Sequence, residues 1–183
     1  MTATSQDVIT AKLERAFDTV DANGDGQLEW ADYKAIADRY STAYRLDAAD
    51  RRSRALQSVF QMFWLELLRH SGVDGDRLTK EQFVAASRRA AIDSSRINVT
   101  DAIAHSIFDV VDVNGDNEVG KDEFARALTD VWKIGAPDAM DAFHRMDTDG
   151  DGAISRQEFL RAMREYFFSD DPEAPGSLFF GRV

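Results

Sequence analysis

The clearest hydrophobic pattern in the chain is a run of apolar residues at spacings of three and four, which predicts a strongly amphipathic helix. Its apolar positions are Ala55, Leu56, Val59, Phe60, Phe63, Trp64, Leu67 and Leu68. Polar stretches that contain Asp and Gly interrupt the chain at 21–32, 71–82, 112–123 and 147–158. The pattern predicts an all-α chain of about eight helices in four helix–loop–helix units, the first at about 5–43 and the second at about 52–92.

The composition between the units indicates where one pair of units ends and the next begins. The segment 93–100 is short and polar, which predicts a linker, and Thr100 is a candidate N-cap for the helix that follows. We therefore expect an N-terminal pair of units at 1–92, a linker at 93–100 and a C-terminal pair at 101–168.

The tail at 169–183 carries three adjacent apolar residues, Leu178, Phe179 and Phe180. Exposed together, they would form an association-prone patch. We expect the tail to dock into a groove of the protein itself, and the alternative is that it binds a partner.

Three of the polar loops align without gaps over twelve residues each. Each has Asp at the first position, Asp or Asn at the third, Asp at the fifth, an apolar residue at the eighth and a carboxylate at the twelfth. A phenylalanine lies four residues before each loop, and an aromatic residue follows it directly. These flanking residues are Phe17, Phe108 and Phe143 before the loops and Tyr33, Phe124 and Phe159 after them. With this repeat the chain resembles the EF-hand family of calcium-binding proteins.

The spacing suits calcium, which takes six to eight oxygen ligands at about 2.3–2.6 Å. Such a loop offers side chains at positions one, three and five, a backbone carbonyl at seven and a carboxylate at twelve. The resemblance assigns as ligands Asp21, Asn23, Asp25, Gln27, Glu29 and Asp32 in the first loop, Asp112, Asn114, Asp116, Glu118 and Glu123 in the third, and Asp147, Asp149, Asp151, Ala153 and Glu158 in the fourth. It also implies that the residues at position eight pair across neighbouring loops.

The first and third loops depart from the family pattern. Asp32 is one methylene shorter than Glu, so we expect a weaker or more magnesium-tolerant first site. Glu29 at position nine can ligate directly and partly offset the short side chain. The third loop has Gly120 at position nine, where a water would fill the coordination point, and Asn117 at position six, where Asn tolerates the left-handed conformation that the turn requires. We expect three calcium sites, with magnesium as a competitor.

The second loop, 71–82, lacks nearly every ligand. Its first, third and fifth positions are Ser71, Val73 and Gly75, and Gln82 stands at the twelfth. Acidic residues are present only at the wrong positions. We therefore expect this loop to keep its pairing role without binding metal.

Composition and charge exclude several other functions. The chain has 183 residues, 22 Lys and Arg against 33 Asp and Glu, a net charge of −11 and no cysteine. Nucleic-acid and membrane-surface binding need clustered basic residues, and disulfides or thiolate metal sites need cysteine. The three histidines, His70, His105 and His144, lie in separate units without a nucleophile motif, so no enzyme activity is expected. With no leader-like or membrane-spanning pattern in the chain, the protein is expected in the cytoplasm.

The lapsed second loop, the long helix before it and the Phe-Phe-Gly tail are similar to those of the sarcoplasmic calcium-binding protein group and its bacterial calerythrin-like relatives. This resemblance implies that the units pack in two pairs into one compact molecule, a monomer that buffers calcium. The alternative is a calcium sensor that binds an unknown target protein. A sensor groove is often rich in methionine, and the four internal methionines here are few and scattered.

Overall fold

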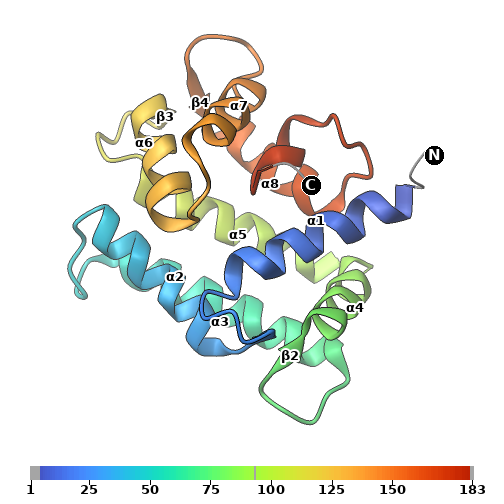
Figure 1. Cartoon of the computed structure of the whole chain (residues 1–183). Helices are drawn as coiled ribbons and strands as arrows, with labels where there is room; N and C mark the ends of the chain where they lie inside the picture. The colour runs from blue at the N-terminus through green and yellow to red at the C-terminus, as the bar shows by residue number, and fades with distance from the viewer. Residues whose placement is uncertain (1–4, 93, 182–183) are drawn as a thin grey trace.

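The computed structural model describes residues 5–92 and 94–181, and these residues form an all-α fold of eight helix-forming segments with minimal β-structure (Figure 1). The helices are α1 (Ser5–Val20), α2 (Trp30–Ala43), α3 (Arg51–Ser71), α4 (Lys80–Ala91), α5 (Ser94–Val111), α6 (Lys121–Arg126), α7 (Ala136–Met146) and α8 (Arg156–Phe168). Two short segments complete them, a π-helical turn η1 (Ala127–Val131) that continues α6 and a 3-10 turn η2 (Pro175–Leu178). The predicted fold class is confirmed, and the amphipathic pattern at 55–68 lies within α3.

The four loops are joined in pairs by short antiparallel strands. Strand β1 (Gln27–Leu28) pairs with β2 (Leu78–Thr79), and β3 (Glu118–Gly120) pairs with β4 (Ala153–Ser155). The register places Leu28 opposite Leu78 and Val119 opposite Ile154, and all four side chains are fully buried. Burial of these position-eight residues fixes the register, because a one-residue slip would turn them toward solvent. The second loop, although it lacks ligands, pairs with the first.

The two pairs pack into one body. In Figure 1 helices α2, α3 and α4 occupy the lower part of the view and α6 and α7 the upper part, while α1 and α5 run across the middle. Helix α3 packs on α2, α4 and α5, and α5 in turn packs on α8, so these helices connect the pairs directly. Across the junction the indole N–H of Trp132 donates to the hydroxyl of Tyr40 at 2.7 Å, and both side chains are buried. The core is therefore continuous between the pairs.

The expected linker at 93–100 differs from the structure. Residue 93 lies outside the described residues, but α5 begins at Ser94, so the rest of the segment is helical. Thr100 is buried inside this helix and is not an N-cap. The prediction weighed only the polar composition of 93–100, whereas the start of α5 depends on tertiary packing, since Val99 and Ile103 are buried in the common core.

The tail returns across the C-terminal pair and packs on it. Phe179 and Phe180 are 1% and 3% exposed. The ring of Phe179 lies 6.5 Å from Phe124 and 5.8 Å from Phe159, the aromatic residues that follow the third and fourth loops. Phe180 lies 4.7 Å from Trp132. The tail thus fills the apolar space between α6 and α8, the helices that follow the third and fourth loops.

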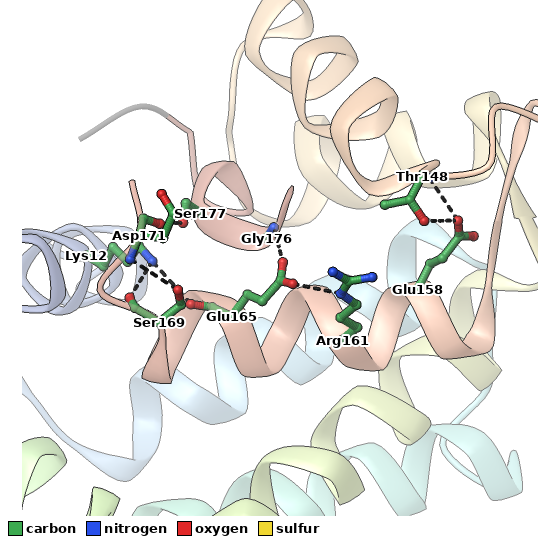
Figure 2. A network of polar contacts seen from close by, with 9 residues as sticks. All are labelled: Lys12, Thr148, Glu158, Arg161, Glu165, Ser169, Asp171, Gly176 and Ser177. Atoms are coloured by element: carbon green, nitrogen blue, oxygen red, sulfur yellow. Dashed lines mark hydrogen bonds and ion pairs between the residues drawn. The ribbon is translucent and has the colours of Figure 1, made fainter. Parts of the chain in front are cut away.

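Polar contacts hold the tail in place, and Figure 2 shows those made by Lys12 and Glu165. Glu165 on α8 accepts a hydrogen bond from the backbone N–H of Gly176 at 2.9 Å, and Lys12 on α1 donates to the carbonyls of Glu165 and Ser169. Arg15 donates to the carbonyl of Phe180 at 3.0 Å. Helix α1 of the N-terminal pair therefore secures the end of α8 and the tail. Among the described residues no helix is long and apolar enough to cross a membrane.

Candidate metal centres

The first, third and fourth loops share one hydrogen-bonded frame. In each, the side-chain oxygen at position three accepts the N–H of position five, and the carboxylate at position five accepts the N–H of position seven. For the first loop these bonds run from Asp25 to Asn23 at 2.8 Å and from Gln27 to Asp25 at 2.9 Å. The equivalent bonds in the other two loops measure 2.9–3.2 Å. The frame turns these side chains toward the inside of each loop, as a cation site requires.

The sixth position of each of these loops has positive φ. Gly26 has φ +77° and Gly152 φ +94°, while Asn117 adopts φ +67° in the third loop. The N–H of Asn117 donates to Asp112 at 3.0 Å, the same bond that the glycines make in the other loops. Asn at this position therefore keeps the turn.

The fourth loop shows most directly that its residues suit a hard cation. Asp147, Asp149 and Asp151 each offer a carboxylate oxygen, and these oxygens lie within 4.8 Å of one another. Oδ2 of Asp147 accepts the N–H of Gly152, but Oδ1 is buried and has no hydrogen-bond partner. A buried carboxylate oxygen without a partner is costly unless a cation binds it. Oxygen donors of this kind and number fit calcium.

The carboxylates at position twelve divide the sites into two types. Glu123 accepts the N–H of Gly120 at 2.9 Å and that of Val113 at 3.0 Å, so it reaches from the start of the exiting helix back to the start of the loop. Glu158 spans its loop in the same way, from Ser155 to Thr148. Burial opposes ionisation of Glu158, but these hydrogen bonds outweigh it and lower its pKa.

Asp32, at the corresponding position of the first loop, accepts the N–H of Glu29 at 2.9 Å. Within the described part of the first loop, no hydrogen bond joins Asp32 to the start of the loop, in contrast to Glu123 and Glu158. Burial, together with the nearby Asp21, raises the pKa of Asp32. The shorter side chain is thus buried among other carboxylates. A bound cation would offset both the repulsion between these carboxylates and the cost of burying the charge of Asp32.

The ninth residue of the first loop has a partner that sequence reasoning missed. Glu29 forms an ion pair with Arg77 at 3.0 Å, and Arg77 is the seventh residue of the second loop. The strand register explains the contact, because Leu28 lies opposite Leu78 and the next pair outward is Glu29 with Arg77. A basic residue at this position of the loop without ligands was the available signal. The guanidinium of Arg77 in the second loop therefore competes with a metal ion for Glu29, a candidate ligand of the first loop.

The second loop carries no carboxylate at positions one, three or five. The hydroxyl of Ser71 donates to the carbonyl of Leu68, and Arg89 donates to the carbonyls of His70 and Ser71. Gln82 accepts the N–H of Thr79 and so caps α4. The polar groups at both ends of this loop are thus engaged in structural contacts.

Comparison with known proteins gives consistent matches. The model of the EF-hand domain pair matches residues 100–164, and an EF-hand model matches residues 13–37. Calerythrin of Saccharopolyspora erythraea is 30% identical over 143 residues, which cover 76% of this chain and 80% of that protein.

Solved structures of similar fold include a Streptomyces coelicolor calcium-binding protein described in terms of prokaryotic calcium-mediated regulation. It is 29% identical, with a TM-score of 0.75 over 90% of this chain and 98% of that one. The photoprotein berovin from the ctenophore Beroe abyssicola, whose three calcium-binding loops bind magnesium ions, is 26% identical. Its TM-score is 0.70 over 86% of this chain and 87% of that one.

Proposed function

Since this chain belongs to the EF-hand family of calcium-binding proteins and is calerythrin-like, we propose that it binds three calcium ions and acts as a cytoplasmic calcium buffer. The ions occupy the first, third and fourth loops through the side chains and carbonyls assigned above. The second loop supports the first by strand pairing and binds no metal. The protein works as a monomer, without catalysis.

The observation that carries the buffer role is the occupied groove of the C-terminal pair. A sensor responds to calcium by opening such a groove to a partner helix. Here Phe179 lies between Phe124 and Phe159, and the tail that carries it is held by hydrogen bonds to α8 and α1. Calcium binding then stabilises a closed molecule, which is what a buffer requires.

The rest of the apolar surface supports the same conclusion. The exposed large apolar side chains of the described residues are Met62, Leu65, Ile92 and Val113. Met62 and Leu65 lie on α3, Ile92 follows α4, and Val113 lies in the third loop. These separate positions do not form a groove for a helix.

An apolar cavity of about 40 Å³ in the centre of the molecule is lined by aromatic residues such as Tyr33, Phe60 and Trp132. It is far smaller than the roughly 150 Å³ that accommodate benzene, so it offers no room for a chromophore-sized ligand.

Magnesium competes at the first loop. Magnesium prefers six oxygens at about 2.0–2.1 Å and accepts a carboxylate through one oxygen. Asp32 is short, and Glu29 is paired with Arg77, so the first loop gives calcium fewer close oxygens than the other two. Binding of magnesium by all three loops of berovin supports this competition.

The alternative function is a calcium-dependent regulator of an unknown protein target. The similarity to the Streptomyces coelicolor protein, which is described in terms of calcium-mediated regulation, favours it. A regulator must expose apolar surface when calcium binds, whereas a buffer need not. The two functions therefore differ in one measurable property.

The discriminating experiment is a calcium titration in the presence of a dye that fluoresces on apolar surface. The control is a variant without working loops, D21A/E123Q/E158Q, which separates the effect of bound calcium from that of the added salt. We expect wild-type dye emission to stay level or fall at saturation. A large rise in the wild type, absent from the control, would contradict the buffer role and support the regulator.

A further inference from the structure

Arg156 connects the third and fourth loops through several side-chain contacts. It is the tenth residue of the fourth loop and the first of α8. Its Nε donates to Oδ1 of Asn117 at 2.9 Å, and its Nη1 pairs with Asp109 at 2.8 Å. The guanidinium lies 4.2 Å from the ring centroid of Phe108, and Nη1 lies 3.4 Å from Nδ1 of His105. One side chain of the fourth loop thus contacts both the third loop and the helix that enters it.

The contact with Asn117 reaches the first ligand of the third loop. Asn117 occupies the left-handed turn at position six, and its N–H donates to Oδ2 of Asp112. At the other end, Arg156 directly follows Ser155, whose N–H donates to the candidate ligand Glu158. A continuous chain of hydrogen bonds and peptide bonds therefore runs from the twelfth position of the fourth loop to the first position of the third.

The N-terminal pair provides an internal comparison. Lys80 is the tenth residue of the second loop, pairs with Asp18 at 2.5 Å and lies 5.5 Å from the ring centroid of Phe17. These residues occupy the same positions as Arg156, Asp109 and Phe108 in the other pair. Position six of the first loop, however, is Gly26, which has no side chain to accept a hydrogen bond. The ion pair and the ring contact are common to both pairs, whereas the link to position six joins the third and fourth loops, the pair in which both loops carry candidate ligands.

We propose that the hydrogen bond between Arg156 and Asn117 couples the third and fourth calcium sites. The inference rests on the proposed function, because it requires both loops to bind calcium. Occupation of the fourth loop fixes the first turn of α8 and with it Arg156, which then holds Asn117 and the turn that positions Asp112. Coupling is reciprocal, so filling the third loop must favour the fourth by the same factor. Asn117 thus has a role in coupling that glycine could not perform, because glycine has no side-chain acceptor for Arg156.

Two variants test the coupling. N117G removes the acceptor and is compatible with positive φ. R156K keeps the positive charge for Asp109 and the contact with Phe108, but an ammonium cannot donate in the planar, two-directional way that serves Asp109 and Asn117 together. Both are made in a D21A parent, so that calorimetric heats report the C-terminal sites alone. The control is K80M, which removes the equivalent cation from the N-terminal pair.

We expect two ions bound in every variant. In N117G and R156K the ratio of the second to the first binding constant should fall on the order of two- to tenfold. This is the range that the loss of one hydrogen bond gives. K80M leaves that ratio unchanged. A merely structural role would weaken both binding steps equally.

A second readout does not depend on binding constants. In an E123Q background only the fourth loop of the C-terminal pair fills, and we expect calcium to shift the amide resonance of Asn117, with the shift lost when R156K is added. Two ions bound with wild-type coupling in N117G and R156K would overturn this inference alone. Fewer than two ions bound by the D21A parent would overturn the proposed function, and the coupling with it.

Discussion

Gly176 is the residue on which docking of the tail depends most sharply. A Cβ added there would lie 2.0 Å from the carbonyl oxygen of Ala162 and 2.6 Å from its Cα. These are backbone atoms in the middle of α8, so they cannot turn aside as a side chain would. We predict that G176A forces the tail away from α8.

The size of the effect follows from what the tail buries. Because the tail can detach instead of straining α8, the cost of the substitution is limited by the free energy of docking. Phe179 and Phe180 are almost fully buried, and burial of each contributes about 1.5–3 kcal/mol. G176A should therefore lose about 3–6 kcal/mol of unfolding free energy, which lowers Tm by about 6–24 °C for a chain of this size.

The assay is thermal unfolding of the calcium-free protein, with dye binding measured well below the transition. The matched control is G75A, whose added Cβ would meet only Val73 Cγ1 at 3.7 Å, an ordinary contact. We expect G176A to melt early and bind dye, while G75A behaves as the wild type. A G176A protein that melts with the wild type and binds no dye would refute the close approach of the tail to α8 and the docking energy assigned to it.

Three further substitutions test individual contacts. R77Q frees Glu29 from an exposed ion pair worth about 0.2–1 kcal/mol, so the first loop should bind calcium about 1.5- to 5-fold more tightly by calorimetry. Arg164 lowers the pKa of Asp101, so their ion pair stabilises the fold above about pH 4 and is lost as the pH falls through the lower folded pKa. D101N should therefore be about 0.5–1 kcal/mol less stable than wild type in denaturant at pH 7, with the difference shrinking below about pH 4. K12M removes the ammonium that donates to the carbonyls of Glu165 and Ser169, of which the Glu165 carbonyl keeps the backbone N–H of Ser169. The substitution should cost about 1–3 kcal/mol in the same assay, whereas a loss near zero would mean that water replaces the ammonium.

The sequence predicted the loops well because their information is local. Twelve consecutive residues determine each candidate ligand set, and the flanking aromatic residues mark where the helices enter and leave. The pairing of the position-eight residues came from the family resemblance, and the structure confirms it with Leu28 opposite Leu78 and Val119 opposite Ile154.

What the sequence left unpredicted depends on contacts between distant segments. The ion pair of Glu29 with Arg77 and the hydrogen bond of Asn117 with Arg156 join residues 48 and 39 positions apart (77 − 29 and 156 − 117), and they exist because strand pairing brings two loops together. The start of α5 was misplaced because burial of Val99 and Ile103 outweighs the polar composition before them. Local patterns therefore select the candidate metal loops, while tertiary register sets which residues of neighbouring loops come into contact.

The central claim is that three loops bind calcium and that the loop at 71–82 does not. Isothermal titration calorimetry with calcium, performed with and without millimolar magnesium, tests it most directly. We predict three ions per chain, with magnesium weakening one of them selectively, and we predict that D21A removes this magnesium-sensitive step and leaves two. A stoichiometry other than three in the wild type, or a D21A protein that still binds three ions, would contradict the assignment of the loops.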